Sequence, residues 1–227
     1  MKRSYINIYQ ITRGIKKDSM FFKVIKSVLI KFLFLAIFFS QTHSKNHPDI
    51  IAIQPYGQVD IRVIQTLQEK IHLFYKYEVI VLPQKDIPED LYYKPGNQYN
   101  AGTLIRRMKN EYPEKYFKIL GVTERDIYHK KNNNPYYGII GLGLVGGKTA
   151  IVSTFRLKKA GGEKEEKLLE RVVKSSVHEI GHLLGLKHCD KTTYCIMQSA
   201  RASVLTIDKK ELKFCPFCLE KLDKLKL

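Results

Sequence analysis

From residue 50 onwards, short runs rich in β-branched residues alternate with longer segments whose apolar residues recur every three or four positions. Short runs that end near glycine or proline are typical of strands, and the longer spacing is typical of amphipathic helices. The strands expected from this pattern are residues 50–55, 77–83, 116–122, 136–145 and 149–157. The alternation predicts an α/β fold with a mixed, twisted sheet of about five strands.

Three helices are expected between and after these strands. One begins after Asp60, which can cap it, and a second begins near Asn100. The strongest helical pattern covers residues 161–185, where one side stays apolar and Gly185 suits a C-terminal stop. Residues 123–128 are expected to form the turn that leaves the third strand.

The first 44 residues have the pattern of a targeting segment. The run FLFLAIFF at 32–39 follows a basic flank and precedes a polar stretch with small residues, as in a signal peptide. Eight apolar residues are too few to cross a bilayer unless Lys31 snorkels and the flanks contribute. We therefore expect residues 1–44 to be a signal peptide or an N-terminal membrane anchor, and residues 45–227 to be the folded domain. The chain would then be exported, to the periplasm or outside the cell, or membrane-anchored.

The chain carries a net charge of +17. Eight of its 39 basic residues and one of its 22 acidic residues lie within 1–44, which leaves +10 for the remainder. Such a surplus favours acidic partners, anionic lipid or nucleic acid. No cluster of Lys and Arg is interleaved with aromatic residues, however, so we interpret the surplus as a basic solvated surface. We expect a monomer with no specific nucleic-acid partner, which contacts a membrane only through an uncleaved N-terminal segment.

A glycine-rich stretch has the same glycine spacing as a nucleotide-binding motif. Gly141, Gly143 and Gly146 spell G-x-G-x-x-G, but the dinucleotide fingerprint requires a helix directly afterwards. Here the next residues are β-branched and strand-like. The stretch is therefore interpreted as a glycine-rich hairpin connection.

The sequence HEIGHLLGLKH contains a metal-binding pattern. His178 and His182 are four residues apart on a predicted helix, so both imidazoles leave the same face. Gly185 allows the chain to turn sharply and bring His188 back to the same ion. Three nitrogens leave a tetrahedral zinc one open position, as in a catalytic site. Glu179 would lie beside the ion, where a general base belongs.

The four cysteines form a second candidate metal site between residues 188 and 218. Cys215 and Cys218 have the two-residue gap of a zinc knuckle, and Cys189 and Cys195 can supply the second pair. Four thiolates would close a structural zinc site beside the catalytic one. In an exported protein, two disulfides are the alternative. At this point both possibilities remain open.

With the cysteines and Met197 added, the segment resembles the archaemetzincins, a branch of the metzincin metalloproteases. The family pattern is H-E-x-x-H-x-x-G-x-x-H-C, then C-x-M, seventeen residues and C-x-x-C, and the likeness covers roughly residues 50–220. Five residues separate the first two cysteines, where the usual pattern has four. The matching positions are His178, Glu179, His182, Gly185, His188, Cys189, Cys195, Met197, Cys215 and Cys218.

The resemblance implies an α+β, zincin-like fold and a zinc-dependent peptidase that acts on peptides or proteins. The helix carrying HExxH would hold a catalytic zinc, and a short C-terminal subdomain would hold a structural zinc, two per chain. Met197 would occupy a Met-turn beneath the histidines. Residues 149–157 would be the edge strand that binds substrate as an added antiparallel strand.

Two alternative functions remain open from the sequence. A non-catalytic zinc protein could bind peptides in the same cleft. A zinc-knuckle protein could bind nucleic acid through its positive charge, although Glu179 would then have no role.

Overall fold

The computed structural model describes residues 50–112, 114–158 and 164–225. The predicted signal peptide or anchor at 1–44 lies outside these residues. No helix in the described ranges is long and apolar enough to cross a membrane.

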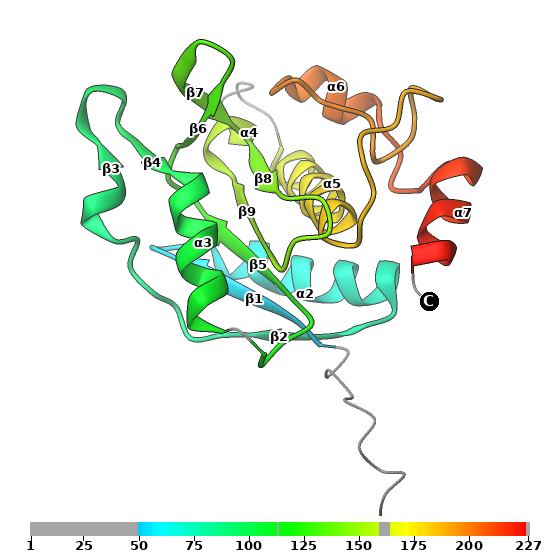
Figure 1. The fold of residues 1–227 in the computed structure, drawn as a ribbon, viewed down its shortest axis with the longest axis horizontal. Coiled ribbons are helices and arrows are strands. Elements are labelled where there is room, and N and C mark those ends of the chain that lie inside the picture. Colours follow the sequence, from blue (N-terminus) through cyan, green and yellow to red (C-terminus); the bar gives the residue numbers. More distant parts are fainter. Residues whose placement is uncertain (1–49, 113, 159–163, 226–227) are drawn as a thin grey trace, which may run out of the picture. The chain divides into compact units, whose positions relative to one another are not determined.

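The central sheet contains five strands in the order β2-β1-β5-β9-β8 (Figure 1). The first four are parallel, and β8 pairs antiparallel with β9, so the sheet is mixed as predicted. These strands are β1 (Ile50–Tyr56), β2 (Glu78–Val81), β5 (Lys118–Thr123), β8 (Gly141–Gly143) and β9 (Thr149–Ser153).

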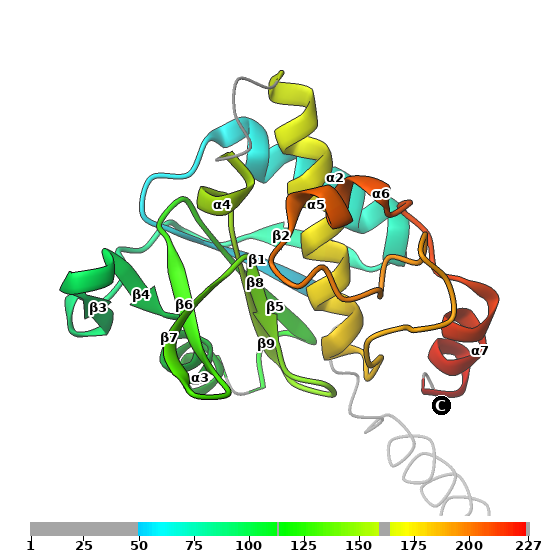
Figure 2. The ribbon, with the colours of Figure 1, turned by 90° about the horizontal axis from the view of Figure 1, so that it is seen from above.

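Helices cover both faces of this sheet. α3 (Ala101–Glu111) lies on one face, and α2 (Ile61–Tyr75) and α5 (Glu165–Leu183) lie on the other (Figures 1 and 2). Ile53 of β1 belongs to the core with α2 and α5, whereas its neighbour Ala52 belongs to the core with α3. A parallel sheet buried on both faces explains why the strands read as continuous apolar runs.

The helix starts follow the predicted caps. The Asp60 side chain accepts a hydrogen bond from the Arg62 amide at the start of α2. The Asn100 side chain accepts one from the Thr103 amide, at 2.9 Å, at the start of α3. Each side chain satisfies one amide that the first helical turn leaves without a partner.

A second, four-stranded sheet has the order β3-β4-β6-β7. It was not predicted. The chain does turn at residues 124–126 after β5, as expected, but residues 127 and 128 of the expected turn belong to strand β6. The single strand expected at 136–145 was wrong, because the chain there is divided between β7 and β8, which pair with different strands. The elements of this region are η2 (Glu89–Leu91), β3 (Tyr92–Tyr93), η3 (Lys94–Gly96), β4 (Gln98–Asn100), β6 (Ile127–Lys131) and β7 (Asn134–Ile139).

The expected edge strand at 149–157 was also misplaced. Strand β9 lies between β5 and β8, and the chain turns into the short helix α4 (Phe155–Lys158) directly afterwards. The edge strand on this side of the central sheet is therefore β8, and β2 forms the opposite edge. A strand buried on both sides by neighbouring strands has few free backbone groups to offer a peptide.

The C-terminal segment packs against α5 and carries two short helices, α6 (Val204–Lys209) and α7 (Pro216–Leu225). A bidentate ion pair joins it to α5. Arg171 is 2% exposed, and its Nε and Nη2 atoms donate to the two Asp208 carboxylate oxygens at 2.7 and 2.6 Å.

Candidate active site

Helix α5 directs two imidazoles toward one point. The Nε2 atoms of His178 and His182 are 3.1 Å apart. The Nδ1 atoms face backbone carbonyls instead, at 2.8 Å from Ile196 O and 2.8 Å from Leu186 O. Such contacts require the proton on Nδ1, so they hold each ring with Nε2 free to bind a metal.

The end of α5 brings the third histidine to the same place. Gly185 has φ +97°, and its amide donates to His182 O at 2.9 Å, while the Leu186 amide donates to Gly181 O at 3.0 Å. This is a Schellman motif, which reverses the chain direction directly after the helix. As a result, His188 returns to the helical pair, and the three ligand nitrogens lie within 4.8 Å of one another.

The three imidazoles fit a zinc ion. Zinc–nitrogen bonds of about 2.0–2.1 Å in tetrahedral geometry place neighbouring nitrogens about 3.4 Å apart. Burial, helped by the charge of Lys210, lowers the pKa of His178 well below its ordinary value. Burial also lowers the pKa of His182, and it lowers that of His188 to about 4. The rings are therefore neutral at pH 7, as a metal requires, and among the described residues no fourth side chain joins this group.

Glu179 lies beside the histidines but outside the ligand group. Its carboxylate accepts a hydrogen bond from the Gly143 amide on β8. A Cβ atom at Gly141 would be only 2.7 Å from Glu179 Oε1. Burial raises the pKa of Glu179 to about 8, although Lys210 and the Gly143 amide act in the opposite direction. The carboxylate is thus held against the edge strand, next to the metal group.

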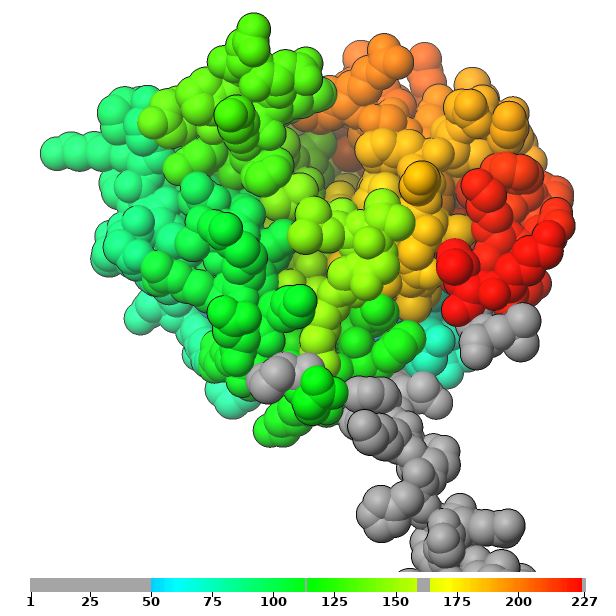
Figure 3. Space-filling view, in the orientation of Figure 1, coloured from blue at the N-terminus to red at the C-terminus, as the bar shows by residue number. Residues whose placement is uncertain are grey.

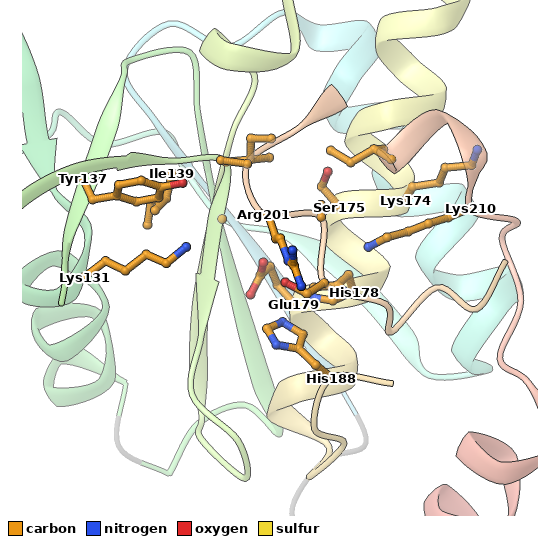
Figure 4. Close-up of a pocket in the computed structure, with 16 residues that line it drawn as sticks. Lys131, Tyr137, Ile139, Lys174, Ser175, His178, Glu179, His188, Arg201 and Lys210 are labelled. Atoms are coloured by element: carbon orange, nitrogen blue, oxygen red, sulfur yellow. The ribbon is translucent and has the colours of Figure 1, made fainter. Parts of the chain in front are cut away.

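A cavity of about 170 Å³ opens over these residues. In Figure 3 its opening lies between the green β6–β7 hairpin and the orange segment that carries α6. Figure 4 shows Lys131 and Tyr137 on one side, with His178, Glu179 and His188 on its floor. The volume is several times that of one liquid water, about 30 Å³, so it can admit part of a peptide.

The four cysteines form a second, buried group. The Sγ atoms of Cys189 and Cys215 are 3.6 Å apart, and those of Cys195 and Cys218 are 3.7 Å apart. A disulfide needs about 2.05 Å, whereas sulfur ligands of tetrahedral zinc lie about 3.8 Å apart. All four thiols are free, so the structure favours a four-cysteine metal site over two disulfides. The additional residue between Cys189 and Cys195 does not move the Cys195 sulfur away from the other three sulfur atoms, since all four lie within 4.8 Å of one another.

Met197 packs against the active-site helix. It is fully buried, and a Cβ atom at Gly181 would be 2.5 Å from its sulfur. Its carbonyl also accepts a hydrogen bond from the Cys189 amide at 2.9 Å. Gly181 lies between the two helical histidines, so Met197 is close to the metal group and to the cysteine group.

Three glycines of this site were not identified as functional from the sequence. Gly141 and Gly143 lie in the stretch interpreted as a hairpin connection, and β8 and β9 do form that hairpin. The available signal was the alternation of glycines, which places both on one face of a strand. Gly181 lies inside the HExxH motif, where only the packing of Met197 shows why a side chain is absent.

Known proteins are similar to this chain in sequence. Residues 59–224 match the profile of peptidase family M54. Archaemetzincin from Archaeoglobus fulgidus is 38% identical over 172 residues, which cover 76% of this chain and 98% of that protein. Archaemetzincin from Methanocaldococcus jannaschii is 34% identical, covering 76% of this chain and 92% of its own.

Solved structures of archaemetzincins are also similar to this chain. The A. fulgidus archaemetzincin, complexed with malonate, has a TM-score of 0.65 at 37% identity and covers 76% of this chain and 99% of its own. The Methanopyrus kandleri archaemetzincin has a TM-score of 0.67 at 29% identity and covers 81% and 98%. Together with the histidine and cysteine groups, these matches define a zinc metallopeptidase. The chain belongs to peptidase family M54, the archaemetzincins, which confirms the resemblance seen in its sequence.

Proposed function

We propose that the chain hydrolyses peptide bonds with a catalytic zinc on His178, His182 and His188 and with Glu179 as general base. The observation that carries this proposal is a group of three neutral imidazoles with a carboxylate held beside it. Zinc bound there would supply a Lewis acid and would lower the pKa of a water toward about 7. The set of three ligands matches catalytic zinc sites better than closed structural ones.

In this proposal, Glu179 moves the proton. Its carboxylate accepts a proton from the water whose oxygen attacks the scissile carbonyl carbon. When the C–N bond breaks, the carboxylate passes this proton to the leaving amine nitrogen. The Gly143 amide keeps the carboxylate in one position, which a positioned general base requires.

Strand β8 is the candidate binding site for the substrate backbone. It pairs only with β9 among the described strands, and Gly141 lines the cavity. An extended peptide could therefore pair with the free edge of β8 through backbone hydrogen bonds. Such pairing demands little of the substrate sequence, so any preference has to come from side-chain subsites.

The cysteine group and Met197 complete the proposed site. We propose that Cys189, Cys195, Cys215 and Cys218 bind a second, structural zinc, for two zinc ions per chain. The distances between their sulfur atoms support this. Met197 is proposed to form a Met-turn, an apolar support beneath the histidines, because its sulfur packs against Gly181.

The location of the protein is a separate proposal. The apolar run and basic flank within residues 1–44 support export, or anchoring to a membrane, of a monomer that meets peptide or protein substrates. Mass spectrometry of the chain from its host would show a new N-terminus near residue 45 after export, or an intact N-terminus in the membrane fraction for an anchor. An intact chain in the cytosol would overturn this proposal.

The general base is tested by Glu179→Gln, which keeps the shape of the side chain but removes its basicity. We expect kcat to fall at least about 100-fold with zinc content unchanged. Glu166→Gln, at an exposed position in the first turn of the same helix, is the control. Cleavage by Glu179→Gln at the wild-type rate would contradict the assignment. A zinc-loaded wild-type chain that binds but cleaves no peptide of a broad library would indicate a peptide-binding protein instead.

A further inference from the structure

Four of the 16 residues that line the cavity over the histidines carry cationic side chains. Among the described residues that line it, Glu179 is the only acidic one, and its carboxylate already accepts a hydrogen bond from Gly143. A recess with one sign of charge attracts ligands of the other sign. The basic lining residues other than histidine are Lys131, Lys174, Arg201 and Lys210.

Lys210 is distinct within this set because it is buried without an ion-pair partner. It is 4% exposed, and its ammonium donates to Ile196 O at 3.2 Å. Among the described residues, no carboxylate lies within ion-pair distance of it. Lys174, by contrast, is paired with Glu170 at 2.5 Å. Figure 4 shows the Lys210 side chain reaching from the α6 side toward Ser175 and His178.

Ser175 adds a second buried donor to the same cavity. It is 7% exposed, and its hydroxyl has no hydrogen-bond partner in the described part of the chain. It precedes His178 by three residues on α5, so the two side chains share one face of the helix. Leaving a buried polar group without a hydrogen bond is destabilising, so such a group needs a reason to be retained.

The surroundings of the Lys210 side chain disfavour its charge. Burial lowers its pKa to about 8, and the charge of Glu179 partly opposes this shift. In the described part of the chain, the only hydrogen-bond partner of this buried side chain is the Ile196 carbonyl. A buried cation of this kind is expensive unless an anion joins it.

We infer that Lys210 and Ser175 form a carboxylate-binding subsite beside the three histidines. The substrates would then be peptides that present an acidic side chain, or their own C-terminal carboxylate, close to the scissile bond. The ammonium and the hydroxyl would both donate to that carboxylate, and the remaining cations of the cavity would favour its entry. This inference rests on the proposed function, because it names the substrate class of the same site.

The test compares the binding of peptide twins to the full zinc-loaded chain carrying Glu179→Gln, which prevents turnover. Each pair consists of two capped peptides that differ at one position, where one has Glu and the other has Gln, and successive pairs move this position along the peptide. A third peptide has no Glu but ends in a free carboxylate, with its C-terminal amide as the twin. We expect the carboxylate twin to bind about tenfold more tightly at one position, because hydrogen bonds to charged groups are worth about that factor.

Two further substitutions identify the residues responsible. Lys210→Met should reduce the ratio between twins to about twofold or less, and Ser175→Ala should reduce it in part. Lys209→Met is the matched control, because Lys209 is the exposed neighbour of Lys210, and it should preserve the ratio. If Lys210 serves only to hold the Ile196 carbonyl that also contacts His178, Lys210→Met will weaken the binding of both twins by the same factor. Measurement of the zinc content will show whether the substitution has damaged the metal site.

The inference is overturned if Glu and Gln twins bind alike, or if the preference survives Lys210→Met. A preference found with the capped Glu and Gln peptides indicates that the subsite binds an acidic side chain. A preference found with the free and amidated C-termini indicates that it binds a terminal carboxylate. Failure of the proposed function would be observed separately, as a wild-type chain that cleaves none of these peptides while still discriminating between the twins.

Discussion

At the scale of single residues, the absence of a side chain at position 141 decides where the Glu179 carboxylate can lie. A methyl group at Gly141 would be 2.7 Å from Glu179 Oε1, closer than atoms can approach. The carboxylate ends a flexible side chain, so it would move while the strand keeps its pairing. We expect Gly141→Ala to lower kcat/KM about 100-fold, with zinc content and unfolding temperature close to wild type.

Gly121→Ala provides a matched comparison on strand β5 of the same sheet. A methyl group there would have its nearest neighbour at 3.4 Å, an ordinary contact. Steady-state kinetics on one peptide should therefore show nearly wild-type activity for Gly121→Ala. Wild-type activity in Gly141→Ala as well would mean that β8 does not position the carboxylate.

The histidines and the glycines of the site differ in how far their roles could be predicted. His178, Glu179 and His182 lie within one turn of helix, so their spacing alone predicts which side chains point together. Gly141 acts through a contact between a strand and a helix that are distant in sequence. No local pattern shows which side chain will lie against it, and only the packed structure does.

At the scale of elements, helices α2, α3 and α5 were predictable because periodicity and caps are local signals. The order of strands in the sheet was not. Residues 136–145 were expected to form one strand, yet β7 pairs with β6 and β8 pairs with β9. Pairing partners depend on the whole chain, so the edge strand was assigned to β9 instead of β8.

The cysteine group is the element that should hold the C-terminal segment to the end of α5. Cys218→Ser removes one of the four sulfur ligands, the one that lies 3.7 Å from Cys195. We expect zinc to fall from about two to about one ion per chain, and the unfolding temperature to fall as well. Metal analysis by mass spectrometry and thermal unfolding would measure both.

Leu219→Ala is the control, because Leu219 follows Cys218 on α7 and is 46% exposed. It should retain both zinc ions. A single zinc in the wild-type chain, or two in Cys218→Ser, would argue against a structural zinc at this position.

At the scale of the whole molecule, Asp208 of the C-terminal segment pairs with two cations of helix α5, the buried Arg171 and the more exposed Lys167. Arg171 and Asp208 form two hydrogen bonds, at 2.7 and 2.6 Å, and their side chains are 2% and 22% exposed. Asp208→Asn removes the charged oxygen atoms that accept both of these hydrogen bonds from the buried guanidinium. We expect Asp208→Asn to lower the free energy of unfolding by about 3 kcal/mol at pH 7, as measured by urea denaturation.

The ion pair between Arg171 and Asp208 also makes the effect of Asp208→Asn on the free energy of unfolding dependent on pH. Hydrogen bonds from Arg171 lower the pKa of Asp208 below its ordinary value. A carboxyl group whose pKa is lower in the folded state stabilises the fold at pH values above its unfolded pKa, about 3.9, and loses that effect as pH falls through the folded pKa. The difference in the free energy of unfolding between wild type and Asp208→Asn should therefore be largest near neutral pH and should shrink in acid.

Asp190→Asn, at an exposed carboxylate 3.6 Å from Lys191, is the control and should change the free energy of unfolding little at either pH. An Asp208→Asn effect that stays constant from neutral to acid pH would show that its cause is packing and not the charge.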